Sequence, residues 1–290
     1  MPVAEVEITS DLVRALIDDQ QPGLSGLPIA LIANGWDNVM FRLGPRHTVR
    51  LPRRKLAVPL MEHEQRWLPS LAASLPLPIP APVHAGWPAA GFPWPWSICP
   101  WMPGAIAEGA AIDAYTVAEQ VGGFLAALHR PAPSDAPVNE FRGIPLSQRD
   151  GVLRDRVSGL SAIVDTAATL ALWGALVATP VWSGPPMWLH GDLHPANILV
   201  ESGRVSGVID FGDITAGDPA TDLAVAWMLL PAEARPAFRA AAGEVDDDTW
   251  NRARGWALAL SIAYMAGSAN NPLIFEIGKR TWESATANQQ

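Results

Sequence analysis

Residues 188–212 read Trp-Leu-His-Gly-Asp-Leu-His-Pro-Ala-Asn-Ile-Leu-Val-Glu-Ser-Gly-Arg-Val-Ser-Gly-Val-Ile-Asp-Phe-Gly. Asp192 and Asn197 lie on a polar stretch before the strand-like segment Ile198–Val200. A turn and a second apolar strand follow, and that strand delivers Asp210. Because a hairpin returns the chain to its starting point, we expect Asp210 beside Asn197. The stretch therefore predicts a loop and a hairpin that gather two carboxylates and one amide.

These three polar side chains are suited to phosphoryl transfer. Magnesium binds in proteins through one or two carboxylates together with substrate phosphates, so Asn197 and Asp210 are the predicted Mg²⁺ ligands. Asp192 is then free to accept a proton from a hydroxyl nucleophile. The order His-x-Asp, four residues, Asn and then Asp-Phe-Gly matches the catalytic pattern of kinases, with Gly191 where protein kinases have arginine.

The stretch resembles the aminoglycoside phosphotransferase family and its choline-kinase-like relatives. The resemblance rests on His-Gly-Asp at 190–192, Ile-Asp-Phe-Gly-Asp at 209–213 and Gly-Asp-Pro-Ala-Thr-Asp-Leu-Ala at 217–224. It implies a two-lobed, protein-kinase-like α+β fold and an enzyme that uses Mg²⁺ and ATP or GTP to phosphorylate an alcohol group. An aminoglycoside-type antibiotic is the expected acceptor. A macrolide, or a sugar, choline-like or homoserine-like metabolite, is the alternative acceptor, and a nucleotide-binding pseudokinase module is the alternative function.

Arg50 is the candidate cation for the nucleotide phosphates. Kinases of this kind need a cation on the third strand, paired with a glutamate from a helix; lysine is usual, but Val-Arg-Leu-Pro at 49–52 contains none. Arginine can bridge phosphates through two N–H groups. Glu64, on a helix expected over 57–73, is the predicted partner, and Glu62 is the weaker candidate. The alternative for Arg50 is an ordinary edge-strand arginine.

The loop at 33–38 is predicted to cover the nucleotide phosphates. It has one glycine, Gly35, which fits the antibiotic kinases better than the glycine-rich protein kinases. Trp36, next to it, is either a lid over the nucleotide or a packing residue.

A second backbone segment, 99–104, is the candidate for adenine binding. The resemblance implies that one backbone C=O and, two residues on, one N–H contact the adenine. Pro100 lacks an N–H but keeps its C=O, and Met102 keeps its N–H, so these two positions are compatible with that pattern. Leu199 and Ile209 are expected to contact the adenine ring, with core packing as their alternative role.

Other residues near the loop invite different interpretations. His190 and His194 are four positions apart, a spacing seen in zinc sites on helices. However, a glycine and a proline within the segment disfavour a regular helix, and no third ligand is evident. By resemblance His190 fixes the loop instead. Asp222 is expected to brace the catalytic loop and Asp218 to cap the next helix.

The acceptor site is expected in the C-terminal part of the chain. By resemblance the acceptor binds between a helical insert at 147–178 and C-terminal helices at 232–285. We expect an acidic pocket there, next to Asp192, because carboxylates attract a cationic acceptor. The candidate carboxylates, each with a solvated surface position as its alternative, are Asp150, Asp155, Asp165, Asp246, Asp247, Asp248 and Glu276.

The pattern along the chain predicts two lobes. An N-lobe at 1–99 is β-rich, carries one long helix and binds the nucleotide. A C-lobe at 100–290 is mostly helical and carries the catalytic loop, the metal site and the acceptor helices. Prolines at 100 and 103 and the glycine at 104 mark the break. Helices of the C-lobe are expected over 112–130, 147–178, 220–230, 234–243 and 248–268, and the last strand of its hairpin over 205–210.

Composition excludes several classes of protein. The formal net charge is −9, with 20 Lys and Arg against 29 Asp and Glu, so the surface repels nucleic acid and anionic membranes. The longest apolar stretches, 167–178 and 255–267, are shorter than the roughly 18 residues that span a bilayer. A single cysteine, Cys99, fits a reducing compartment. We therefore expect a cytoplasmic monomer or homodimer that binds neither nucleic acid nor membrane.

Overall fold

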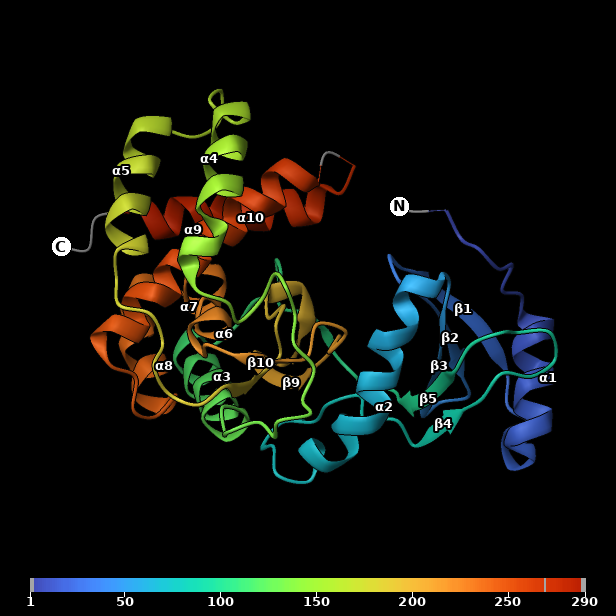
Figure 1. Cartoon of the computed structure of the whole chain (residues 1–290). Helices are drawn as coiled ribbons and strands as arrows, with labels where there is room; N and C mark the ends of the chain where they lie inside the picture. The colour runs from blue at the N-terminus through green and yellow to red at the C-terminus, as the bar shows by residue number, and fades with distance from the viewer. Residues whose placement is uncertain (1–2, 269, 288–290) are drawn as a thin grey trace. The chain divides into compact units, whose positions relative to one another are not determined.

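The structure, a computed structural model, describes residues 3–268 and 270–287 (Figure 1). The chain divides into an N-terminal unit, Met1–Ser74 with Pro78–Pro103, and a C-terminal unit, Leu75–Leu77 with Gly104–Gln290. The main division falls between Pro103 and Gly104, whereas the sequence placed the boundary after Cys99.

An antiparallel five-stranded sheet with strand order β1-β2-β3-β5-β4 forms the N-terminal unit. Side chains alternate along β2, so Val39, Phe41 and Leu43 all face the core. β3 lies between β2 and β5 and is therefore a central strand. The strands are β1 (Ile29–Asn34), β2 (Asn38–Leu43), β3 (His47–Pro52), β4 (His84–Gly86) and β5 (Trp96–Pro100).

Two helices belong to this unit. α1 (Ser10–Gln20) begins at Thr9, whose hydroxyl accepts the N–H of Leu12 at 3.2 Å. Its apolar face joins the core of the sheet. α2 (Val58–Ala72) has a proline in its first turn, where the missing N–H costs nothing, and buries Glu64. Two short 3₁₀ helices complete the unit: η1 (Pro22–Leu24) and η2 (Lys55–Ala57).

The C-terminal unit contains two small antiparallel sheets. β8 (Ile198–Glu201) and β9 (Arg204–Val208) form the expected hairpin, to which β6 (Ala105–Ile106) is added. Ser202 and Gly203 both have positive φ, 51° and 78°, as a two-residue type I′ turn requires. β7 (Met187–Leu189) pairs with β10 (Thr215–Gly217). The loop at 190–197, which carries Asp192 and Asn197, therefore connects one small sheet to the other.

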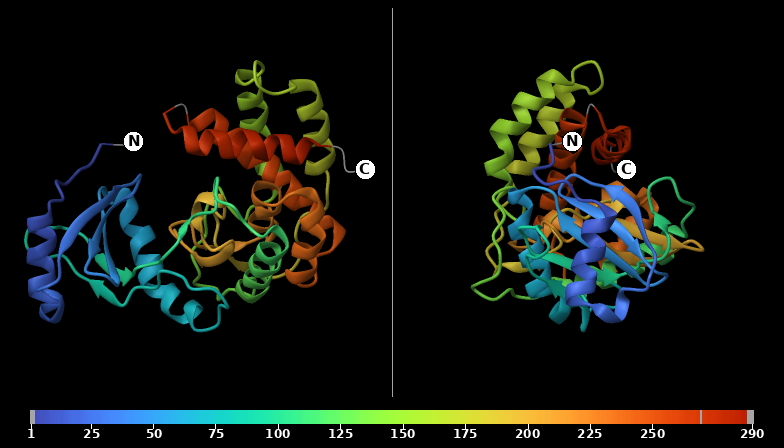
Figure 2. Two further views of the ribbon diagram at one scale, coloured as in Figure 1. Left: turned by 180° about the vertical axis from the view of Figure 1, so that it is seen from behind. Right: turned by 90° about the vertical axis from the view of Figure 1, so that its right-hand side faces the viewer.

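Helices make up most of the rest of this unit. α9 is buried on nearly all sides, as expected for a central helix. It packs against α10, and the two lie side by side in both views of Figure 2. The α-helices are α3 (Ala114–Leu128), α4 (Asp150–Gly159), α5 (Thr166–Val177), α6 (Ala220–Leu223), α7 (Val225–Leu229), α8 (Arg235–Ala241), α9 (Asp247–Gly267) and α10 (Pro272–Thr286). Short 3₁₀ helices are η3 (Leu146–Arg149), η4 (Pro195–Asn197) and η5 (Ala232–Ala234).

A β-rich unit followed by a helical unit confirms the α+β class. The continuous helix expected over 147–178 was wrong: the chain turns between α4 and α5, where Asp165 accepts the N–H of Ala168 at 3.0 Å and starts a new helix. The strand expected over 205–210 ends at Val208. None of the helices in the described part of the chain combines the length and apolar character needed to cross a membrane.

Candidate active site

A buried carboxylate fixes the loop that follows β7. Asp222, on α6, accepts the N–H of His190 at 2.7 Å and that of Gly191 at 2.9 Å. Its Oδ2 also lies 3.2 Å from Nε2 of His129. The Asp222 side chain is fully buried, so these groups take the place of water around the carboxylate. The expectation that Asp222 braces this loop is confirmed.

The glycine of this loop is dictated by a close approach. Gly191 has φ +87°, a conformation that side chains disfavour. A Cβ there would lie 2.2 Å from the backbone oxygen of Asp213. No larger residue fits at position 191, because the loop passes so close to the backbone of Asp213. Protein kinases have arginine at the corresponding position.

His190 connects the loop to the end of the hairpin. Its Nδ1 accepts the N–H of Asp192 at 3.2 Å, so the ring hydrogen is on Nε2, which donates to the C=O of Ile209 at 2.9 Å. This is the loop-fixing role implied by the resemblance. The zinc alternative gains no support, because in residues 3–268 and 270–287 no three His, Cys, Asp or Glu side chains are grouped to hold a metal ion.

Two donors from distant segments meet at one oxygen of Asp192. Nη2 of Arg142 donates to Oδ1 at 3.0 Å, and the hydroxyl of Tyr264 donates to the same oxygen at 3.0 Å. The other oxygen, Oδ2, faces Nε2 of His194 at 3.5 Å. Oδ1 is thus occupied, and Oδ2 is the oxygen left for a further partner. The Asp192 side chain is 25% exposed, so such a partner can approach it.

The surroundings keep Asp192 ionised. Burial alone would raise the pKa of its carboxyl, but His194 and Arg142 hold that pKa well below its ordinary value. Burial raises the pKa of the Tyr264 phenol, and the negative charge of Asp192 raises it further. The phenol therefore stays protonated and donates, while the carboxylate accepts. Sequence patterns gave no sign of Arg142 or Tyr264.

Asn197 has its amide nitrogen engaged and its amide oxygen available. Nδ2 donates to the backbone C=O of Asp192 at 2.9 Å and lies 3.3 Å from Nε2 of His194. Because Nδ2 is used, Oδ1 is the atom that can face a cation.

Asp210 follows the hairpin directly and lies beside Asn197. The N–H of Ile209 donates to the C=O of Asn197 at 2.9 Å, which closes the hairpin at its base. Asp210 is exposed and has φ +64°, a conformation that costs a non-glycine residue about 1–3 kcal/mol and is typical of functional positions. One amide oxygen and one carboxylate, completed by phosphate and water oxygens, is a donor set that fits Mg²⁺.

A further carboxylate at this site, Asp213, was not singled out from the sequence. Its Oδ1 accepts Nδ2 of Asn139 at 2.7 Å. Burial raises the pKa of the Asp213 carboxyl, and the negative charges of Asp192 and Asp210 act in the same direction. The only available sequence signal was its place directly after Asp-Phe-Gly.

Asp218 has two roles where the sequence predicted one. Its Oδ1 accepts the N–H of Ala220, the first residue of α6, at 3.0 Å, although the N-cap position itself is Pro219. Its Oδ2 also accepts Nε of the buried Arg252 at 2.7 Å. Asp218 therefore joins the start of α6 to α9.

In the N-terminal unit, Arg50 on β3 pairs with Glu64 on α2. Nη1 lies 3.0 Å from Oε1 and 2.8 Å from Oε2. The two side chains are only 8% and 2% exposed. Since β3 is a central strand and the pair is buried, the alternative of an edge-strand arginine is wrong. The role of Arg50 toward nucleotide phosphates stays a prediction.

The loop between β1 and β2 is closed by its own backbone. Gly35 N–H donates to the C=O of Asn38 at 2.9 Å, and Gly35 C=O accepts Nη1 of Arg53 at 2.8 Å. Trp36 is 59% exposed, so it is not a core packing residue. Of the two roles considered for Trp36, only the lid remains as a prediction.

The segment predicted to bind adenine follows directly from β5. Trp101 N–H donates to the C=O of Arg46 at 2.8 Å, just before β3. β5 ends at Pro100, so Met102 lies beyond the strand. The adenine contacts of the Pro100 C=O and the Met102 N–H stay a prediction. Two apolar residues of the β8–β9 hairpin, one buried and one half-buried, remain predicted contacts of the adenine ring: Leu199 and Ile209.

The carboxylates expected to line an acceptor pocket have other environments. Asp165 and Asp246 cap α5 and α9, and Asp150 accepts Nε1 of Trp173 at 2.7 Å. The remaining four are exposed: Asp155, Asp247, Asp248 and Glu276. These positions give no support to an acidic pocket, and the charged group hydrogen-bonded to Asp192 is the cation of Arg142.

Comparison with known proteins places this arrangement in context. The sequence profile described as "Phosphotransferase enzyme family" matches residues 28–256. Among curated proteins, the uncharacterized protein YcbJ of Bacillus subtilis (strain 168) is 45% identical over 42 residues. That match spans 14% of this chain and 14% of that protein.

Solved structures share the fold over nearly the whole chain. The GDP complex of wild-type aminoglycoside 2′-phosphotransferase-IIIa superposes with a TM-score of 0.71 at 20% identity, covering 96% of this chain and 99% of that one. The GDP and kanamycin complex of APH(2″)-IIIa gives 0.70 at 20% identity, covering 94% and 97%. Macrolide 2′-phosphotransferase MphH from Brachybacterium faecium gives 0.62 at 23% identity, covering 94% and 98%. The kinase-like α+β fold expected from the sequence is confirmed.

Proposed function

The chain belongs to the phosphotransferase enzyme family, and we propose that it transfers the γ-phosphate of ATP or GTP to a hydroxyl group of a small molecule. The observation that carries this proposal is the Asp192 carboxylate. One of its oxygens is held by two donors, and the other, which faces Nε2 of His194 at 3.5 Å, keeps a lone pair for a further donor. Its backbone C=O is bonded to Asn197, and the adjoining hairpin ends at Asp210.

Asp192 acts on the acceptor hydroxyl. The open Oδ2 accepts the hydrogen of that hydroxyl and turns an oxygen lone pair toward the phosphate. Because the pKa of the carboxyl is held low, Asp192 is a weak base. It orients the nucleophile in the ground state and takes the proton as the new P–O bond forms.

Asn197 and Asp210 are the residues that would hold Mg²⁺. When bound, the ion neutralises charge on the β- and γ-phosphate oxygens. Since Nδ2 of Asn197 is hydrogen-bonded to the backbone of Asp192, the proposed metal ligand and the proposed base are fixed by one loop.

The N-terminal unit supplies the remaining nucleotide contacts in this proposal. Arg50, oriented by Glu64, offers N–H groups to the phosphates. The loop with Gly35 covers the phosphates. The backbone groups of Pro100 and Met102 bind the adenine edge.

We propose an aminoglycoside-type antibiotic as the acceptor, because one structure of similar fold is a complex with kanamycin. A macrolide is the second candidate, and one observation favours it. A cavity of about 650 Å³ is lined mainly by apolar residues of the segment 132–145 and by Trp182, and Arg142 contributes to its wall. A wide apolar cavity suits a macrolide better than a polycation.

The test is a phosphotransfer screen with Mg-ATP and Mg-GTP against aminoglycosides, macrolides, choline and sugars. Product formation is measured by mass spectrometry and nucleoside diphosphate release. Asp192→Asn should lower kcat by roughly 10²–10⁴-fold while nucleotide binding is unchanged. The KM for an aminoglycoside should rise with ionic strength, and that for a macrolide should change little. Nucleotide binding without phosphorylation of any hydroxyl compound would favour the pseudokinase alternative.

The proposal includes a cytoplasmic location. A single cysteine fits a reducing compartment, and the phosphate donors ATP and GTP are intracellular compounds. We further propose a monomer or homodimer, which analytical ultracentrifugation would distinguish.

A further inference from the structure

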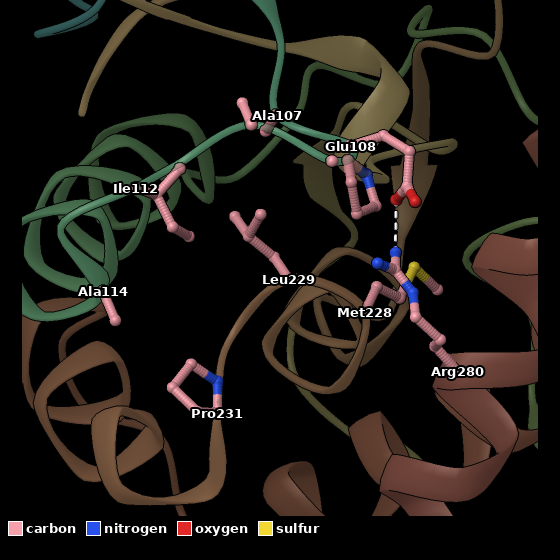
Figure 3. Close-up of a pocket in the computed structure, with 11 residues that line it drawn as sticks. Ala107, Glu108, Ile112, Ala114, Met228, Leu229, Pro231 and Arg280 are labelled. Carbon is pink, nitrogen blue, oxygen red and sulfur yellow. Dashed lines mark hydrogen bonds and ion pairs between the residues drawn. The ribbon is translucent and has the colours of Figure 1, made fainter. Parts of the chain in front are cut away.

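A cavity of about 370 Å³ lies in the C-terminal unit (Figure 3). The size is within the range of pockets that take small ligands. Polar and apolar atoms line it in similar measure. The apolar side chains come from the segment after β6, from the end of α7 and from the residues that follow: Ala107, Ile112, Ala114, Met228, Leu229 and Pro231.

This cavity shares a wall with the catalytic loop. Pro195, which lines the cavity, belongs to η4, the 3₁₀ turn that also contains Asn197. The N–H of Ala107, which also lines the cavity, donates to the C=O of Ile198 at 2.8 Å, so a second part of the wall is tied to the strand that leaves the loop. A ligand in this cavity would therefore contact the backbone that carries the proposed catalytic groups.

The polar part of the lining includes one charged pair. Glu108 forms an ion pair with Arg280, which extends from α10 (Figure 3). The two partners differ in exposure: the Glu108 side chain is 10% exposed, and that of Arg280 is 47% exposed. Among the described residues, Arg280 is the only side chain that contacts the Glu108 carboxylate through a hydrogen bond or ion pair.

This asymmetry decides which partner can leave. A buried carboxylate needs a cation or hydrogen-bond donors, because burying an unpaired charge is costly. A half-exposed arginine on a long side chain loses little by turning into water. A second cation is therefore the ligand group best suited to take the place of Arg280 beside Glu108. An anionic ligand would leave Glu108 uncompensated, and a neutral ligand would have nothing to offer it.

We infer that the cavity binds an ammonium group carried on a compact, largely apolar body, with Glu108 as its counter-ion once Arg280 has turned away. The ammonium donates to the Glu108 carboxylate, and the body packs against Ile112 and Leu229. We identify the ligand with an amine-bearing ring of the acceptor, because the cavity borders the catalytic loop. That identification rests on the proposed phosphotransferase function, whereas the binding of the amine does not.

The inference is tested first by calorimetric titration without nucleotide. Cyclohexylamine, protonated at pH 7, is the probe, and cyclohexanol is its neutral counterpart. We expect Glu108→Gln to weaken cyclohexylamine binding about tenfold, the effect of losing a hydrogen bond to a charged group. Arg280→Gln should strengthen it by a comparable factor, since the competing cation is gone. Cyclohexanol should bind wild type and both variants alike.

Two controls accompany these variants. Arg280→Lys keeps a cation beside Glu108 and should bind cyclohexylamine as wild type does. Lys279→Gln removes a positive charge from the neighbouring position of α10 without touching Glu108, and it should change nothing. If Glu108→Gln and Arg280→Gln changed the affinity for cyclohexylamine in the same direction, the inference would be overturned, because a purely structural ion pair predicts that result. Absence of saturable binding to Arg280→Gln would also overturn it.

The link to the acceptor is tested separately. With the acceptor identified by the screen, Glu108→Gln should raise its KM about tenfold with little change in kcat, and cyclohexylamine should inhibit competitively against it. Competitive inhibition supports the acceptor assignment, and non-competitive inhibition overturns that assignment while leaving the amine site. If no acceptor is phosphorylated, the proposed function fails, but the titrations still decide whether the amine site exists.

Discussion

Removing the guanidinium that contacts Asp192 should reveal how much catalysis depends on a fixed carboxylate. The change is Arg142→Met, which keeps the length of the side chain and deletes the donor. In the wild-type chain Arg142 and Tyr264 both donate to Oδ1 at 3.0 Å. The variant keeps one of these two donors, so Asp192 gains freedom to rotate while its Oδ2 remains chemically intact.

The expected magnitude comes from the lost hydrogen bond. A hydrogen bond to a charged group contributes about 1.5–3 kcal/mol. Asp192 is 25% exposed, so water replaces part of that interaction and the lower half of the range applies. Each 1.36 kcal/mol lost from the transition state lowers the rate about tenfold. We therefore expect kcat to fall by about 10- to 50-fold and the free energy of unfolding by about 1.5–2.2 kcal/mol.

Steady-state kinetics and urea unfolding measure these quantities together. The KM for nucleotide should stay unchanged. Arg142→Lys should recover part of kcat because the charge is retained, and Tyr264→Phe should lose less than Arg142→Met because the phenol is neutral. Arg154→Met, on the exposed surface of α4, is the matched control and should behave as wild type. A folded Arg142→Met enzyme with wild-type kcat would refute the positioning role.

Three further predictions concern the metal ligand, the phosphate cation and the buried cysteine. Asp210→Asn should weaken Mg²⁺-nucleotide binding by at least about tenfold, because a neutral amide is a poor ligand for a hard cation; unchanged magnesium dependence would speak against this ligand. Arg50→Ala should raise nucleotide KM and lower kcat, while Arg50→Lys retains some activity; equal activity of the two variants would show that the charge is not used. Burial raises the pKa of the Cys99 thiol to about 12, so at pH 8 iodoacetamide should label Cys99 only at the rate of unfolding, and fast labelling of the native protein would contradict this.

The parts of the site that sequence predicted are those that local spacing controls. A tight turn at Ser202-Gly203 determines the hairpin register, and the register in turn places Asp210 beside Asn197. The pairing of Arg50 with Glu64 follows from one strand and the next helix, separated by few residues. In each case the chain returns over a short distance, so hydrophobic pattern and turn chemistry are enough.

The contacts that distant residues make with Asp192 could not be predicted from local spacing. Arg142 and Tyr264 reach Asp192 from 50 and 72 positions away. Arg142 lies in an irregular segment without periodicity, and Tyr264 lies in α9, where an apolar neighbourhood suggested only core packing. The break at 160–165 was missed for a different reason: the apolar run continues across it, but Asp165 before Thr166 was already a helix-start signal.

The net charge of the chain was a poor guide to the charge of its site. Helix caps and ion pairs engage carboxylates that a simple count of charges treats as free, and the carboxylates of Asp192 and Glu108 each have an arginine partner. What distinguishes the two pairs is exposure: the arginine at Asp192 is 16% exposed, and the arginine at Glu108 is 47% exposed. A cationic acceptor can displace the second arginine more easily than the first, since the more exposed guanidinium is better solvated by water after it leaves its partner. An acceptor amine is therefore expected at Glu108, which leaves the open oxygen of Asp192 for the hydroxyl group that is phosphorylated.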